Sequence, residues 1–138
     1  SSGRIARHAT IIDGLLSDPA RTAVVAVARP EELPVNETIE LEQALDRELG
    51  LPLTLAVVNR VVAGRFSAAE AAELDGAPDG PAVRAARSRH RFARGQQAQV
   101  ARLRRGVGCP VVRVHELFRP ALDAQAIRTL AGDLERAL

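Results

Sequence analysis

The chain has 138 residues, of which 46% are hydrophobic and 26% charged, and its net charge is +2. This length suffices for one domain with a substantial core, so we place 1–138 in a single domain. No stretch approaches the roughly 18 apolar residues that span a bilayer. The single cysteine, Cys109, excludes an internal disulfide and a multi-cysteine zinc site, and it fits a reducing compartment, so we expect a cytoplasmic protein.

Hydrophobic spacing predicts four elements in the first part of the chain. In order, they are an amphipathic helix over 1–17, a buried strand over 22–28, a helix that begins at Asn36 or Thr38 and ends at Leu49, and a buried strand over 53–59. The strands lack polar alternation, which predicts that both faces of the sheet are covered. Gly50 is placed to end the second helix in a left-handed conformation. A strand, a helix and a parallel strand make a right-handed βαβ unit.

The second part of the chain predicts three helices and one strand. They are a short helix over 67–74 that Ser67 and Glu70 cap, an arginine-rich helix over 82–105, a strand over 111–114, and a last helix that Asp123 caps. The inward side of the last helix is expected to carry Ile127, Leu130, Ala131, Leu134 and Leu138. Together the elements predict a three-layer α/β fold, with a mostly parallel sheet (strands about 22–28, 53–59 and 111–114) flanked by helices.

Polar residues follow two of the predicted strands at the point where each strand ends. Asn59 and Arg60 end the strand over 53–59, and four residues follow the strand over 111–114, namely His115, Glu116, Leu117 and Phe118. The carboxyl ends of parallel strands meet at one edge of the sheet, and open α/β sheets bind their ligands there. These six residues are therefore the candidate binding residues.

Two further features each allow two roles. Glu31 and Glu32 follow the first strand, where they could activate a water molecule or bind a metal. Alternatively, their negative charges could stabilise the next helix by interacting with the positive end of its dipole. The arginines of the helix over 82–105 form either a solvated face or a contact with an acidic partner or a phosphate group. Three phenylalanines are the only aromatic residues, which disfavours a base-stacking surface, so we expect no nucleic-acid partner.

Motifs of a self-sufficient active site are absent from the sequence. It contains no GxSxG, HExxH or GxGxxG, and the spacing of its three histidines suggests no zinc site. All 19 basic side chains are arginine, so a phosphate-binding loop of the form GxxxxGK(S/T) cannot occur. We therefore expect neither catalytic residues nor a metal site. Methionine is absent too, which we interpret as the mark of a fragment of a longer chain.

The order of the elements and two short motifs resemble one known family. PEELPVNET at 30–38 follows a strand and opens a helix, and VVNR at 57–60 ends the next strand. A long helix and the strand VVRV at 111–114 come after them. This arrangement resembles the carboxyl-terminal half of the anion-transporting ATPases. These are deviant P-loop ATPases that include the arsenical-pump enzymes of ArsA type and the ATPases that target tail-anchored membrane proteins.

The resemblance implies that the chain is the adenine-binding part of an ATPase that couples ATP to transport or targeting. Asn59 would contact the nucleobase, Arg60 would belong to the same nucleotide-binding site, and the loop over 115–118 would close over the adenine. The family has proline where His115 stands. ATP is the implied cofactor, while the P-loop and the groups that hold Mg²⁺ belong to the first half of the family fold. We therefore expect that this polypeptide alone does not hydrolyse ATP.

The resemblance also implies partners. The parent would form a homodimer or a heterodimer with an ArsA-like subunit, with a peripheral link to a membrane partner. The strand over 22–28 would normally lie beside the phosphate-loop strand, so its unpaired edge would favour association between copies. The alternative interpretation is a standalone, non-catalytic α/β module that binds a protein or a small ligand through the same crevice.

Overall fold

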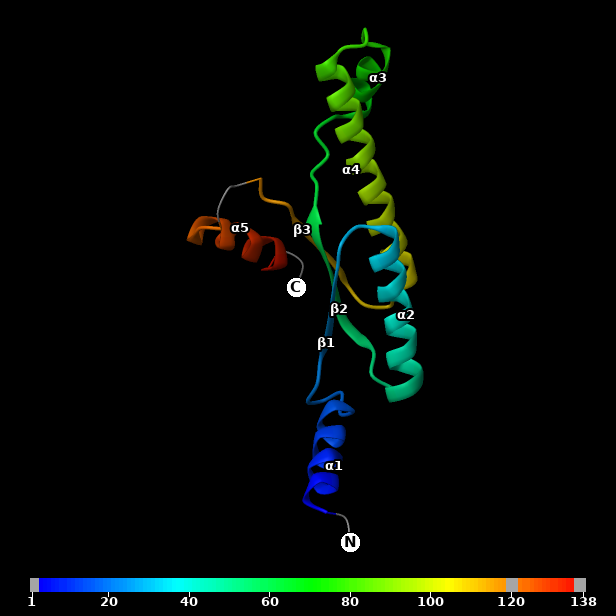
Figure 1. The fold of residues 1–138 in the computed structure, drawn as a ribbon, viewed down its shortest axis with the longest axis vertical. Helices are drawn as coiled ribbons and strands as arrows, with labels where there is room; N and C mark the ends of the chain where they lie inside the picture. Colours follow the sequence, from blue (N-terminus) through cyan, green and yellow to red (C-terminus); the bar gives the residue numbers. More distant parts are fainter. Residues whose placement is uncertain (1–2, 119–121, 136–138) are drawn as a thin grey trace.

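A three-stranded parallel sheet forms the centre of the protein. The structure is a computed structural model that describes residues 3–118 and 122–135. The strands are β1 (Val24–Ala28), β2 (Leu53–Val61) and β3 (Val111–His115), in the order β1-β2-β3 (Figure 1). The predicted α/β class with a parallel sheet is confirmed. β1 begins two residues later than predicted, β2 ends two residues later, and β3 ends one residue later.

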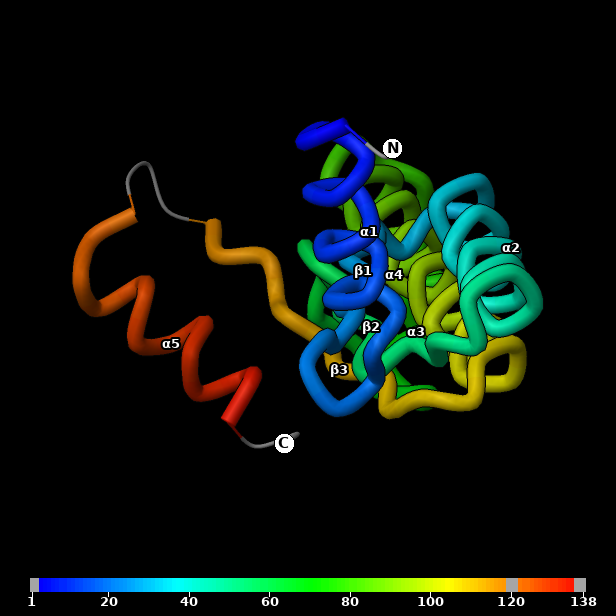
Figure 2. Tube along the Cα trace, turned by 90° about the horizontal axis from the view of Figure 1, so that it is seen from below, coloured from blue at the N-terminus to red at the C-terminus, as the bar shows by residue number. Residues whose placement is uncertain are grey.

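Helices lie on both sides of this sheet but cover it unequally. α2 (Glu32–Leu49) and α4 (Pro81–Gly106) pack together on one side, whereas α5 (Ala124–Glu135) lies on the other side, against β3 (Figures 1 and 2). α3 (Ala68–Gly76) packs on α4, and α1 (Arg4–Leu16) extends beyond the end of the sheet where β1 begins. Among the described residues, no helix combines the length and the apolar character that crossing a membrane requires.

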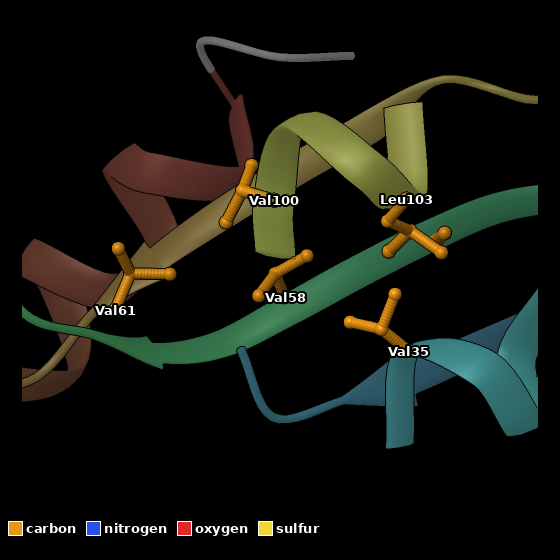
Figure 3. Close-up of a cluster of buried hydrophobic side chains, with 6 residues drawn as sticks. Val35, Val58, Val61, Val100 and Leu103 are labelled. Carbon is orange, nitrogen blue, oxygen red and sulfur yellow. The ribbon is translucent and has the colours of Figure 1, made fainter. Parts of the chain in front are cut away.

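The hydrophobic core lies between β2 and the pair α2 and α4. Its buried members come from all three elements: Val35, Ala56, Val58, Val61, Val100 and Leu103 (Figure 3). Ala56 and Val58 point to the same face because successive strand residues alternate, and the long helix α4 supplies Val100 and Leu103 at helical spacing. The core therefore anchors β2, the strand that carries Asn59 and Arg60 near its end.

Local signals explain most helix ends. Gly50 ends α2 with φ of 61°, and Ser67 and Glu70 form the predicted capping box at the start of α3. Asp123 accepts a hydrogen bond from the backbone N–H of Ala126 at 2.7 Å, so it caps α5 as predicted. The predicted start of α2 was wrong, because the helix begins at Glu32. Pro34 falls in its first turn, where a missing N–H has no cost.

One face of the sheet is not covered as predicted. Val25 is 51% exposed and Val27 is 66% exposed, so the prediction that helices cover both faces of the first strand was wrong. Val25 pairs with Leu55 and Val27 with Val57, and these two residues of β2 are half-buried. We call these four residues the open sheet face. Since α5 covers only the β3 side of this face, β1 presents apolar side chains to solvent.

The two terminal helices also bury less than their sequences suggest. α1 forms over Arg4–Leu16 but has no buried residue, and Ile12 is 55% exposed. In α5 the buried residue is Ala126, whereas Ile127 is 58% exposed, so its predicted inward position was wrong. The predicted roles of residues 1–2 and of Leu138 lie outside the described residues. Both helices therefore carry apolar surface that the described residues leave uncovered.

Candidate functional site

A pocket of about 340 Å³ opens where β2 and β3 end. Its lining combines polar groups from the strand ends with leucines from the segment that leads to α5 and from α5 itself: Asn59, Arg60, His115, Glu116, Leu117, Leu122 and Leu130. We call it the strand-end pocket. Five of the six candidate binding residues of the sequence line it, which follows from the parallel arrangement of β2 and β3.

The backbone turns sharply at the mouth of this pocket. Arg60 has φ of 62°, the only left-handed residue other than glycine among the described residues. The pairing of β2 with β3 shifts register between Val58 and Val61, so one additional residue is accommodated there. A left-handed conformation at a residue with a side chain is strained, and such residues concentrate at functional sites. The irregularity turns Asn59 and Arg60 out of the regular strand pattern and leaves both exposed.

An ion pair joins the two strand ends across the pocket. The Arg60 guanidinium donates from Nη2 to Glu116 Oε1 at 2.5 Å, and the backbone N–H of Glu116 donates to the carbonyl of Val61 at 2.9 Å. The hydrogen bond with Glu116, followed by its negative charge, raises the pKa of Arg60 above its ordinary value. The Arg60 guanidinium and the Glu116 carboxylate therefore pair with each other in the lining of the pocket, and neither is an unpaired charge.

His115 is held by an acid from α5. The Asp133 Oδ2 atom accepts from the backbone N–H of His115 at 3.0 Å and lies 3.1 Å from its Nδ1. The Asp133 side chain is only 8% exposed, whereas that of His115 is 41% exposed. A carboxylate at Nδ1 favours the tautomer with the proton on that nitrogen. The Nε2 atom of neutral His115 is then an acceptor.

Asn59 offers the unsatisfied polar group of the strand-end pocket. Its side chain is exposed, lines the pocket, and makes no hydrogen bond to any group in the described ranges. A terminal amide carries both a donor and an acceptor. Asn59 can therefore pair with a ligand edge that presents the complementary acceptor and donor.

Phe118, the sixth candidate residue, lies apart from the lining of the strand-end pocket. Its ring is 60% exposed, and the Arg89 guanidinium carbon stands 4.5 Å from the ring centroid. A cation over an aromatic face is attracted by the ring quadrupole. This contact ties the loop after β3 to α4, so Phe118 positions the loop instead of lining the pocket.

The end of β2 is fixed from the opposite side by a buried amide. Gln96 is 5% exposed, and its Oε1 accepts from the backbone N–H of Val62 at 2.8 Å. Val62 follows β2 directly and is itself buried. No other acceptor for this N–H exists within the described residues. Gln96 therefore holds the segment that carries Asn59 and Arg60 against α4.

The Gln96→Leu variant is expected to lose about 2 kcal/mol of unfolding free energy, because it leaves the buried N–H of Val62 without an acceptor. Denaturation in urea, followed by circular dichroism, measures this loss. The matched control is Gln97→Leu on the exposed next position of α4, which should change the value by less than about 0.5 kcal/mol. Equal stability of the two variants would contradict the anchoring role of Gln96.

The remaining reactive groups have structural roles. No cluster of three or more metal-binding side chains occurs within 3–118 and 122–135. Burial, and then the charge of Glu42, raise the pKa of the Cys109 thiol, which disfavours its thiolate. Glu32 lies in the first turn of α2, which favours the helix-dipole role among the two that its sequence position allowed.

Sequence reasoning missed the groups that α5 and its approach bring to this pocket. Leu122 and Leu130 line the pocket, and Asp133 of α5 holds His115, yet their residue types alone do not mark them as members of a site. Comparison with known proteins adds no assignment, since no family model matches the chain and no curated protein matches it.

Proposed function

We propose that the strand-end pocket binds the adenine ring of ATP, and that the chain is the carboxyl-terminal part of an ArsA-like ATPase. One observation carries the proposal. The residues that the resemblance assigns to the base come from two separate strands, yet five of the six line a single pocket. The proposed role of the parent is to couple ATP binding and hydrolysis to transport or targeting.

The chemistry of the pocket suits a purine. The Asn59 amide is unpaired and can match the adjacent donor and acceptor of the adenine edge. Leu117, Leu122 and Leu130 supply apolar walls for the flat ring. The volume of about 340 Å³ falls within the roughly 300–1,000 Å³ that ligand pockets occupy. Together these groups would orient the base and exclude water from its edge.

The sequence contains no P-loop that could bind the phosphate groups of ATP. The sequence has no lysine for a P-loop, and the strand-end pocket contains a single acid, Glu116, which is already paired with Arg60. Phosphoryl transfer depends on positioning and on charge stabilisation at the phosphates. In the proposed parent, the first half of the fold supplies these groups and Mg²⁺. We therefore expect no ATP hydrolysis by this polypeptide alone.

The Asn59→Ala variant is expected to bind ATP about tenfold more weakly than the original chain, because it removes the donor and acceptor that read the base. Isothermal titration calorimetry at fixed ionic strength measures the two dissociation constants. The matched control is Gln43→Ala, which removes an exposed amide of α2 away from the pocket. Its affinity for ATP should stay within twofold of the original.

Two results would contradict the proposal. One is an equal loss of affinity for ATP in the Asn59→Ala and Gln43→Ala variants. The other is the absence of ATP binding in a preparation that circular dichroism shows to be folded. The second result would favour the standalone binding module, with the strand-end pocket open to another small ligand or to a peptide.

The proposed partners follow from the uncovered apolar surface. Val25 and Val27 are exposed on β1, and β1 pairs with no strand other than β2 in the described ranges. Edge strands with apolar side chains favour pairing with another chain. We propose a homodimer or a heterodimer with an ArsA-like subunit through this surface. The parent would also have a peripheral link to a membrane partner.

A further inference from the structure

A second pocket lies on the opposite side of β3 from α5. It has a volume of about 360 Å³ and is bounded by the loop after β2, by β3 and by the second half of α4. Its lining includes the polar side chains of Gln97, Arg104, Arg113 and His115, together with Ala63 and Gly64 of the loop. We call it the arginine pocket. Of the described residues, only His115 lines both this pocket and the strand-end pocket.

The charge in the arginine pocket is uncompensated. Arg104 and Arg113 form no ion pair with any described residue, and no carboxylate lines the pocket. On α4, three arginines outside the pocket have partners, whereas Arg91, Arg94, Arg102 and Arg105 form no ion pair with a described residue either. Arg84 and Arg87 pair with Asp79, and Arg89 stacks on Phe118. What distinguishes Arg104 and Arg113 is that both line one pocket to which no described carboxylate contributes.

Three lining residues also carry neutral donors without partners among the described residues. The side chain of Gln97 makes no hydrogen bond within the described chain, and the backbone N–H groups of Ala63 and Gly64 donate to no described acceptor. A Cβ atom at Gly64 would stand 3.3 Å from Nε2 of Gln97, so glycine leaves room for this amide beside the loop. The pocket therefore gathers two cations and several unused donors around one hollow.

We propose that the arginine pocket binds a phosphate-type oxyanion. Guanidinium groups present fixed, planar donors that match phosphate oxygens, and charge-assisted hydrogen bonds of this kind are stronger than neutral ones. Arg104 and Arg113 approach from a helix and a strand, so together they can contact different oxygens of one group. The amides of Gln97 and the loop supply the remaining donors. This proposal does not depend on the adenine assignment, because it uses a different pocket.

The site is tested by titrating the protein with inorganic pyrophosphate at fixed ionic strength. Binding is monitored through the amide resonances in ¹H–¹⁵N NMR spectra. We expect saturable shifts at Ala63 and Gly64. Arg104→Gln and Arg113→Gln should each weaken binding about tenfold, since each removes a charged donor. The control variants Arg102→Gln and Arg105→Gln remove the same charge from exposed positions of α4 outside the pocket, and should weaken binding less than twofold.

Equal weakening by the pocket and control variants would overturn the proposal, because it would show only general attraction to a basic helix. Unsaturated shifts spread over all arginines would overturn it as well. The Asn59→Ala variant should retain pyrophosphate binding, so failure of the adenine assignment leaves this test intact. Competition by ATP identifies the source of the phosphate. If ATP displaces pyrophosphate, the site binds the phosphate of a nucleotide. If ATP does not displace it, the site binds a free oxyanion.

Discussion

The Leu103→Ala variant is expected to lose about 3 kcal/mol of unfolding free energy, the largest effect of any single conservative change considered. Leu103 has no exposed surface and packs between Val35 of α2 and Val58 of β2 (Figure 3). Alanine removes the buried methyl groups and leaves a cavity. Because the core is closely packed, the neighbouring side chains can fill this cavity only in part. Urea denaturation, followed by circular dichroism, gives the difference in free energy.

Leu49→Ala provides the control for this prediction. Leu49 lies in the last turn of α2 and is 48% exposed, so the same change should cost less than about 1 kcal/mol. A similar loss in both variants would contradict the position of the core between β2 and the pair α2 and α4. A small loss at Leu103 alone would show that the site can collapse around the cavity.

Placing lysine at both Val25 and Val27 is expected to weaken self-association by at least tenfold. Both side chains are more than half exposed and adjoin the half-buried Leu55 and Val57, so the open sheet face presents a continuous apolar surface. Two ammonium groups on this surface would have to lose their hydration in a dimer. Sedimentation equilibrium over a range of protein concentrations measures the dissociation constant.

The control for this change carries the same added charge elsewhere. Gln43→Lys with Ala69→Lys places two lysines on exposed positions of α2 and α3, away from the open sheet face. Its self-association should stay within twofold of the original chain. If the original chain remains monomeric at the highest concentration, or if both double variants dissociate equally, the open sheet face is not the contact between copies.

The two pockets at one edge of the sheet differ in the chemistry of their linings. The strand-end pocket has apolar walls and one free amide, whereas the arginine pocket has two unpaired cations. An uncharged ring suits the first and an oxyanion suits the second. His115 stands between them, and Asp133 fixes its ring. The Asn59 and Arg104 variants therefore test the proposed adenine site and the proposed oxyanion site separately.

The sequence by itself determined the features that depend on neighbouring residues. Apolar runs at 22–28, 53–59 and 111–114 predicted the three strands because buried strands need continuous hydrophobic side chains. Gly50, Ser67 and Asp123 marked helix ends through local hydrogen bonds and glycine's freedom at positive φ. The order of the strands then placed Asn59 and His115 at one edge of the sheet.

Only the tertiary structure decided the features that depend on contacts between distant residues. The Gln96 bond to Val62 and the Asp133 bond to His115 join separate elements, and no local pattern predicts either pair. The sequence left two roles open for the arginines of the helix over 82–105, and only the structure brings Arg104 and Arg113 to the lining of one pocket. The exposure of Val27 has a similar cause. An apolar run shows that a strand can be buried, but the surrounding elements decide whether each face is covered.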